Sequence, residues 1–419
     1  MSSAPSDEGM LSPYRVLDLT DERGLLCGKI LADLGADVIQ VEPPTGNSAR
    51  RIGPFYQDEV HPERSLFWWA YTTNKRSITL NLTTTDGQAL LKRLVQSTDF
   101  LIESGAPGDM AALGLGYDEL AALNPALIVV SITAFGQDGP YAMYQAPDLV
   151  GMGLAGFMYV TGDPDRAPLR VGFPHFYLHG AAAGATGAMI AHAQRVLTGQ
   201  GQRVDVSCQE AVARALASAP QSYAMTGAVI VRQGSYRQTS ATTYMRITWP
   251  CKDGFVNFQF SGGSAAGRGV NSLARWMAEE GMGDAYLESL DFTQLGYGTI
   301  TREMLERTVP PIERFMMCHT KQELFDGAVS RRILLFPVAT PRDIAHHAQL
   351  QARQYFQQVP QPELGTTLTM LGPFVRASAT PLRQRRLPPT LGQHNAEVYM
   401  QELGLQPGDL ARLREAGVV

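Results

Sequence analysis

Residues 14–44 read YRVLDLTDERGLLCGKILADLGADVIQVEPP and contain two short apolar runs separated by a helical pattern. The first run, residues 14–20, has the length and apolar content of a buried strand. Leucine and isoleucine then recur at helical spacing over residues 25–34, and Gly35 is a typical residue to end such a helix. The second run, residues 36–42, stops at two prolines. This order predicts a strand–helix–strand unit.

The same alternation continues through the first half of the chain. Further apolar runs lie at residues 77–82, 100–103 and 126–133. Short unbroken apolar strands that alternate with helices indicate a parallel sheet covered by helices, so we predict an α/β fold. A long helix of small residues is expected over residues 178–197. After this helix, alternating strand-like runs and amphipathic helices predict a smaller α+β domain at about residues 221–331.

The composition excludes several classes of protein. Of the 419 residues, 44% are hydrophobic, and 35 basic against 40 acidic residues give a net charge of −5. The chain can therefore bury a large core, and it lacks the basic tract of a nucleic-acid-binding surface. The four cysteines form no C-x-x-C pair, which argues against a disulfide framework and structural zinc. Without a membrane-length apolar run or a signal-peptide pattern, we expect a cytoplasmic protein that uses no metal, nucleic acid or membrane.

Two local patterns suggest chemistry that their context does not support. Residues 151–156 fit G-x-G-x-x-G, but Pro147 and Asp148 interrupt the preceding segment, where a dinucleotide site needs a strand. A glycine-rich helix start is expected there instead. His175 and His179 would share one helix face, as metal ligands can, yet neither an H-E-x-x-H motif nor a third ligand accompanies them.

Several sequence blocks point to a known family. They are LADLGADVI at residues 31–39, NKRSI at 74–78, VSITAFGQ at 130–137, TGQGQRVDV at 198–206 and LGQH at 391–394. In this order the blocks resemble the class III CoA-transferases, the family of formyl-CoA and carnitine CoA-transferases. The resemblance covers nearly the whole chain.

The resemblance implies an architecture and a reaction. Family members have a Rossmann-like large domain built from both termini, here residues 10–205 and 340–419, and an inserted small domain, here residues 221–331. The connections, about residues 206–220 and 332–339, would let two chains interlock as rings. The reaction moves CoA from a donor thioester to an acceptor carboxylate. An active-site aspartate forms a mixed anhydride and then an aspartyl-CoA thioester on the way.

The chain departs from the family at the catalytic position. The family places its aspartate in a segment that reads approximately G-x-P-x-x-D, whereas residues 172–177 read GFPHFY, so Tyr177 stands where the aspartate belongs. A phenol has a pKa of about 10 and is mostly protonated at neutral pH, and its ester would not relay CoA by the same route. Phe176 and Leu178 are not carboxylates, so a one-residue shift does not restore the nucleophile.

Positions that the resemblance assigns to CoA binding also differ. Residues 104–108 read SGAPG in place of N-F-x-P-G, and Ala112 stands where the family has an arginine that pairs with phosphate. The turn at residues 20–24 holds two acids and lacks the family's A-G-P. The cations that remain as candidate CoA contacts, with surface or packing roles equally open, are Lys75, Arg76 and Arg51.

An intact scaffold without the nucleophile predicts a non-catalytic subunit. We expect an aspartate-bearing paralogous partner that holds most of the CoA thioester. The resemblance is to heteromeric enzymes of aromatic degradation, which move CoA between a dicarboxylic acyl-CoA such as succinyl-CoA and an organic acid such as benzylsuccinate. One alternative is a catalytic homodimeric transferase or acyl-CoA isomerase that uses Tyr177, His175, His179 or Asp148. Another is a CoA-independent binding protein on the same scaffold.

Overall fold

The computed structural model describes residues 9–216, 219–238, 244–296 and 299–419. The chain forms two compact units, and each is described by itself. Unit 1 contains the residues up to 155, residues 173–215 and residues 348–419, and unit 2 contains residues 156–172 and 216–347.

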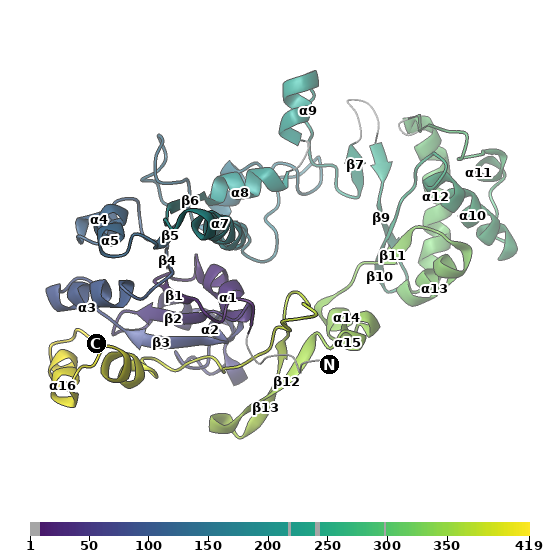
Figure 1. Cartoon of the computed structure of the whole chain (residues 1–419). Helices are drawn as coiled ribbons and strands as arrows, with labels where there is room; N and C mark the ends of the chain where they lie inside the picture. Colours follow the sequence, from purple (N-terminus) through teal and green to yellow (C-terminus); the bar gives the residue numbers. More distant parts are fainter. Residues whose placement is uncertain (1–8, 217–218, 239–243, 297–298) are drawn as a thin grey trace. The chain divides into compact units, whose positions relative to one another are not determined.

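A six-stranded parallel sheet forms the centre of unit 1 (Figure 1). Its strands are β1 (Arg15–Asp18), β2 (Asp37–Glu42), β3 (Lys75–Thr79), β4 (Phe100–Glu103), β5 (Ile128–Thr133) and β6 (Arg203–Ser207). They lie in the order β3-β2-β1-β4-β5-β6, and every neighbouring pair is parallel. The predicted α/β fold with a parallel sheet is confirmed, and the predicted strand–helix–strand unit corresponds to β1, α1 (Leu25–Asp33) and β2.

Helices cover both faces of this sheet. On one face, α3 (Thr85–Val95) and α5 (Tyr117–Leu123) share a buried core with the inward side chains of β1 to β5. On the other face lie α1 and α7 (Phe176–Thr198), which also pack on each other. The other helical and extended elements of unit 1 are η1 (Ser48–Arg51), η2 (Tyr56–Asp58), α2 (Leu66–Thr72), α4 (Asp109–Ala112), α6 (Asp148–Leu154), α8 (Cys208–Ala215), α15 (Ala348–Ala352), β12 (Phe356–Gln361), η3 (Pro362–Leu364), β13 (Thr366–Leu371), the π-helix η4 (Ala396–Glu402) and α16 (Pro407–Glu415).

Small residues allow α7 to approach the sheet closely. A Cβ atom on Gly184 would lie 3.1 Å from the side chain of Ile132 in β5, and one on Gly180 would lie 2.2 Å from the Cys208 sulfur. A larger side chain at Gly184 would push α7 away from β5, and one at Gly180 would push it away from α8 (Cys208–Ala215). The predicted small-residue helix is confirmed, and it ends at Gly199, whose φ of +72° favours glycine.

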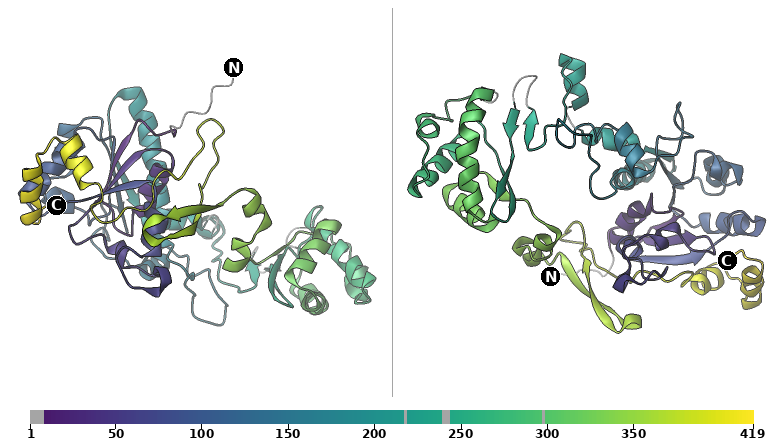
Figure 2. Two further views of the ribbon diagram at one scale, coloured as in Figure 1. Left: turned by 90° about the horizontal axis from the view of Figure 1, so that it is seen from below. Right: turned by 180° about the vertical axis from the view of Figure 1, so that it is seen from behind.

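The C-terminal segment returns to the outer strand of the sheet. The His394 amide donates to the Ser77 carbonyl at 2.9 Å, and the Asn81 amide donates to the Val418 carbonyl at 2.7 Å. Figure 2 shows this segment in yellow beside the purple strands. Both ends of the unit 1 sequence therefore contribute to one layered structure.

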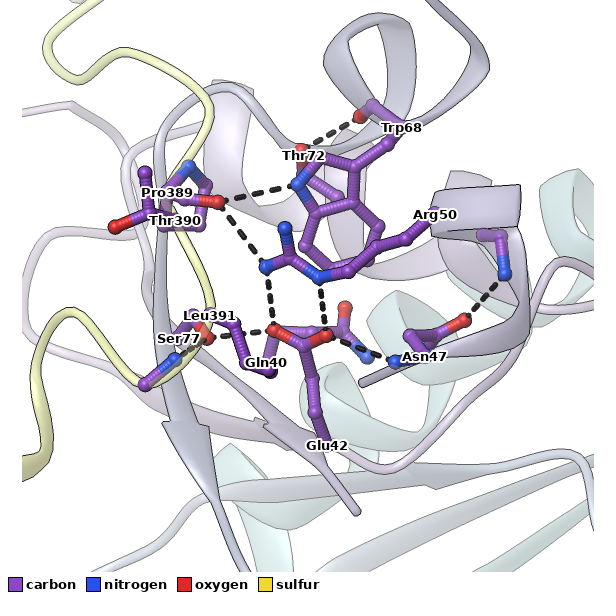
Figure 3. Close-up of polar contacts among 12 residues, drawn as sticks. Gln40, Glu42, Asn47, Arg50, Trp68, Thr72, Ser77, Pro389, Thr390 and Leu391 are labelled. Carbon is purple, nitrogen blue, oxygen red and sulfur yellow. Dashed lines mark hydrogen bonds and ion pairs between the residues drawn. The ribbon is translucent and has the colours of Figure 1, made fainter. Parts of the chain in front are cut away.

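A buried ion pair fastens this segment to the sheet (Figure 3). Glu42, the last residue of β2, binds Arg50 at 2.6 and 2.8 Å, and neither side chain is more than 1% exposed. The Arg50 guanidinium lies 3.9 Å from the ring centroid of Trp68. Arg50 and the Trp68 indole both donate to the Pro389 carbonyl at 3.1 Å, and Ser77 donates to Glu42 at 2.6 Å. The pair thus connects β2, β3, η1, α2 and the C-terminal segment.

Unit 2 has an α+β structure of its own. Three antiparallel strands, in the order β11-β10-β9, pack against helices around a core that includes Trp249, Phe258 and Phe315. Among the described residues, no helix of the chain is long and apolar enough to cross a membrane. The elements of unit 2 are α9 (Ala219–Thr226), β7 (Tyr236–Gln238), β8 (Tyr244–Arg246), β9 (Thr248–Cys251), β10 (Gly254–Phe258), α10 (Ala266–Glu279), α11 (Ala285–Ser289), α12 (Arg302–Cys318), α13 (Lys321–Arg331), β11 (Leu335–Pro337) and α14 (Pro341–Ala345).

Removal of Arg50 tests the role of the buried pair. We expect Arg50→Ala to lower the free energy of unfolding by about 3–5 kcal/mol, because it leaves the Glu42 carboxylate buried and uncompensated. The matched control is Arg64→Ala, which breaks the partly exposed pair with Glu59 and should cost about 1 kcal/mol or less. Urea unfolding followed by tryptophan fluorescence measures both. Equal losses in the two variants would contradict the assignment.

Candidate functional site

The order of the strands marks one crevice in unit 1 as the expected ligand site. From β1 the chain proceeds to β2 and β3 on one side and then crosses to β4, β5 and β6 on the other. In open α/β sheets, ligands bind at such a switch point, outside the carboxyl ends of the strands. Two turns meet here. The Asp21 amide donates to the Ser104 hydroxyl at 3.1 Å, and this hydroxyl donates to the Asp21 carboxylate at 3.0 Å.

Arg23 neutralises the carboxylate in this crevice. Its Nε atom lies 2.9 and 3.0 Å from the two Asp21 oxygens, and its Nη2 atom lies 2.6 Å from Oδ2. The hydrogen bond from Arg23 to Asp21 raises the pKa of the guanidinium further above its ordinary value. The two side chains therefore form a charge-neutral pair in the crevice.

Tyr177 lies in the first turn of α7 and faces the same pair. Its hydroxyl donates to the Ala146 carbonyl at 2.8 Å. Burial raises the pKa of Tyr177 to about 12, although the Arg23 guanidinium, which also hydrogen-bonds the phenol, opposes this shift. A phenol with so high a pKa is neutral throughout the physiological range.

The start of α7 is closed by a carboxylate. Asp148 accepts hydrogen bonds from the amides of His175 and Phe176 at 2.8 and 2.9 Å, so it caps the helix. His179 directs its Nδ1 atom at the His175 carbonyl at 2.9 Å, and the two imidazole rings lie 6.0 Å apart. Within the described part of the chain, no three histidine, cysteine or acidic side chains gather as a metal site would require. The carboxylate and both histidines thus shape the helix start.

Phosphate anchors are sparse around the crevice. Ala112 is the last residue of α4 and offers no donor from its side chain. Asp109, in the first turn of that helix, binds the Ala106 amide at 2.8 Å and adds negative charge. The side chains of Ala112 and Asp109 therefore offer no cationic donor to the diphosphate of CoA.

Lys75 is an internal residue. It is fully buried, and its ammonium donates to Asp18 at 2.7 Å, to the Leu25 carbonyl at 3.0 Å and to Gln40 at 3.0 Å. These three bonds use its three protons, so no donor of Lys75 remains for a phosphate. The ammonium instead holds β1, β2 and β3 together.

Arg76 and Arg51 differ in whether their guanidinium groups are available to contact CoA. Arg76 is 2% exposed and pairs with Asp37, Glu397 and Glu402 at the opposite end of β3 from the carboxyl edge of the sheet. Arg51 is exposed, and within the described residues it donates to the Thr45 carbonyl at 3.3 Å. A CoA contact through Arg51 stays a prediction.

The structure adds Arg23 and Ser104 to the site. The sequence shows acids in the turn after β1, but the pairing of Asp21 with Arg23 depends on the backbone of that turn. The D-x-R spacing is the signal that could have indicated it. In the sequence, Ser104 is visible as the replacement of an asparagine, and the structure adds that its hydroxyl joins the turns that follow β1 and β4.

The chain belongs to CoA-transferase family III. The sequence model of this family matches residues 11–395, which confirms the predicted family. The fold agrees, because the crystal structure of a CAIB/BAIF family protein from Brucella suis superimposes with a TM-score of 0.78. That structure is 26% identical and covers 94% of this chain and 99% of its own.

Two curated relatives are similar over almost their whole length. Subunit BbsE of the succinyl-CoA:(R)-benzylsuccinate CoA-transferase of Thauera aromatica is 31% identical over 97% of this chain and 98% of that protein. The succinyl-CoA–D-citramalate CoA-transferase of Chloroflexus aurantiacus is 34% identical over 98% of both. The predicted resemblance to a subunit of a succinyl-CoA-dependent transferase is thereby confirmed.

The ionisation of Tyr177 can be measured directly. The chain has 15 tyrosines, so the titration is read as the difference in ultraviolet absorbance between the wild-type chain and Tyr177→Phe. The difference should titrate near pH 12. Because the pKa of an unfolded tyrosine is about 10, the stability that the neutral phenol contributes should be complete below pH 10 and disappear between pH 10 and 12. A titration below pH 9 would show an activated phenol and contradict the assignment.

Proposed function

We propose that this chain is the non-catalytic subunit of a heteromeric class III CoA-transferase. The observation that carries the proposal is the neutral Tyr177 phenol at the family's aspartate position, packed against a charge-neutral Asp21–Arg23 pair. CoA transfer through the enzyme needs a carboxylate, because both covalent species must stay activated toward the next attack. An aryl ester on Tyr177 would not form from a phenol of such high pKa at neutral pH.

Asp21 is a carboxylate in this crevice that could compete for the catalytic role. Both of its oxygens accept hydrogen bonds from Arg23, and one also accepts from Ser104. An ion pair of this kind lowers the charge that an attacking oxygen can offer, and attack would require that the pair first break. The geometry therefore favours a structural role for Asp21.

The partner in this proposal is an aspartate-bearing paralogue. It would bind the CoA thioester and carry the covalent steps, while this chain completes the assembly. Two relatives support a heteromer, since BbsE is named as a subunit and another relative, 28% identical, is the beta subunit of a succinyl-CoA–L-malate CoA-transferase. Their names also support succinyl-CoA as the donor and an organic acid such as benzylsuccinate as the acceptor.

The proposed assembly is an interlocked pair of chains. A large domain would comprise residues 10–205 and 340–419, and residues 221–331 would form the small domain. The connections near residues 206–220 and 332–339 would let each chain pass through the other. This part of the proposal rests on the family resemblance.

Binding of CoA to the isolated chain tests the loss of the CoA site. Calorimetric titration of the purified chain with CoA should give no saturable heat, because the β4–α4 loop offers no cation for the diphosphate. Arg51→Ala serves as the informative variant, since Arg51 is the exposed cation among the three candidates. Saturable binding that is lost in Arg51→Ala would establish a CoA site in this chain and contradict the proposal.

Restoration of the carboxylate alone should not restore activity. We expect Tyr177→Asp to show no transfer of CoA from succinyl-CoA to benzylsuccinate above the background hydrolysis of the thioester. The new carboxylate would face Arg23 and pair with it, and the CoA anchors would still be missing. Chromatography of the acyl-CoA products measures the reaction, and Tyr177→Phe is the matched control. Steady turnover by Tyr177→Asp would show that the CoA site is intact.

A further inference from the structure

A cavity of about 630 Å³ lies in unit 2, beside the first half of α12. It is bounded by residues 163–165, residues 233–236, the end of β8 and α12, and all of these belong to unit 2. Leu305 and Val309 of α12 and the side chain of Tyr236 line it with apolar surface. Pockets of this volume, mostly apolar with a few polar groups, are typical binding sites of small organic molecules.

Arg246, at the end of β8, brings a buried cation to this cavity. Its side chain is 10% exposed. Its Nε atom donates to the Thr248 carbonyl at 3.3 Å, and Nη1 and Nη2 donate to Glu313 at 3.1 and 3.2 Å. A guanidinium carries five N–H groups, so two of them have no acceptor among the described residues. Arg246 can therefore donate to a ligand carboxylate without giving up a bond within the chain.

The turn at residues 163–165 brings negative charge to the same cavity. Within the described part of the chain, the carboxylates of Asp163 and Asp165 have neither a hydrogen-bond partner nor an ion-pair partner. The backbone holds the turn in place, because the Gly234 amide donates to the Gly162 carbonyl at 2.8 Å and Arg232 donates to the Asp163 carbonyl at 3.1 Å. Both carboxylates are thus available to a cationic group.

The remaining charges at the cavity cancel in pairs. Arg302 binds Glu306 at 3.0 Å, and Glu313 balances the charge of Arg246. The uncompensated charges are therefore the two carboxylates of the turn, which repel a simple anion. A simple cation, in turn, would leave the free N–H groups of Arg246 without an acceptor. A ligand that carries charges of both signs satisfies the two sets of groups together.

We propose that this cavity binds an α-amino acid with an apolar side chain. Its ammonium group would pair with Asp163 and Asp165, and its carboxylate would accept from Arg246. Leu305 and Val309 would cover its side chain. The site lies in unit 2, whereas the Tyr177 crevice lies in unit 1, and it does not depend on the proposed subunit role.

Calorimetric titration of the full chain with L-phenylalanine tests this site. N-acetyl-L-phenylalanine lacks the ammonium group, L-phenylalaninamide lacks the carboxylate, and glycine lacks the apolar side chain. We expect saturable binding of L-phenylalanine and at least about tenfold weaker binding of each of the other three, because each loses one set of contacts.

Three variants connect the binding to these residues. The double variant Asp163→Asn with Asp165→Asn should weaken L-phenylalanine at least about tenfold and should not weaken N-acetyl-L-phenylalanine, which has no ammonium group to lose. Arg246→Lys keeps the charge beside Glu313 but loses the planar fork, and should weaken L-phenylalanine while L-phenylalaninamide changes less. Asp326→Asn makes the same change as the double variant at an exposed position of α13 and should bind as the wild-type chain does.

Thermal unfolding of each variant shows that unit 2 remains folded, and the double variant gives a result even where Arg246→Lys does not fold. The proposal would be overturned by a wild-type chain that does not bind L-phenylalanine or that binds N-acetyl-L-phenylalanine equally well. Unchanged binding in the double variant would overturn it too.

Discussion

The buried ion pair between Lys75 and Asp18 lies beneath the turn on which the site depends. Asp18 accepts from the Thr20 amide and hydroxyl at 3.0 and 2.6 Å, while Gln40 donates to the Asp18 and Thr20 carbonyls at 3.0 and 2.9 Å. Both side chains are fully buried, and two buried charges are stable only when further hydrogen bonds satisfy them. Here those hydrogen bonds also fix the backbone where it leaves β1. Asp21 and Arg23 follow directly in the sequence, so the Lys75–Asp18 pair determines where these two side chains lie in the crevice.

In the proposed subunit role, the family's fold is kept without its reaction, and the crevice accounts for this. In place of a carboxylate that attacks a thioester, α7 begins with a phenol whose pKa is raised to about 12, and the adjacent charges of Asp21 and Arg23 cancel. Because the charges of Asp21 and Arg23 are already neutralised within the protein, the crevice is stable without a bound substrate. The small-residue packing of α7, the parallel sheet and the buried Glu42–Arg50 pair retain the architecture on which an active partner could assemble.

Much of the fold could be predicted because strands and helices here carry their own periodicity. The apolar runs of β1, β2 and β5 and the small residues of α7 are local signals, as is the substitution of Tyr177 within a family motif. The roles of cations could not be predicted in this way. Lys75 has the same sequence pattern whether it faces a phosphate or Asp18, and only the register of β3 beside β2 sends it into the core. The Asp21–Arg23 pair depends likewise on the shape of one turn.

The most direct test of the account is the composition of the native enzyme. Mass spectrometry of the complex purified from its own host, followed by CoA-transfer assays of the separated and recombined subunits, measures it. The account predicts a stoichiometric paralogue that carries the family aspartate, with transfer only when that paralogue is present. A homodimer of this chain that transfers CoA by itself would contradict the central claim, because the reaction would then proceed through the side chains of the closed crevice.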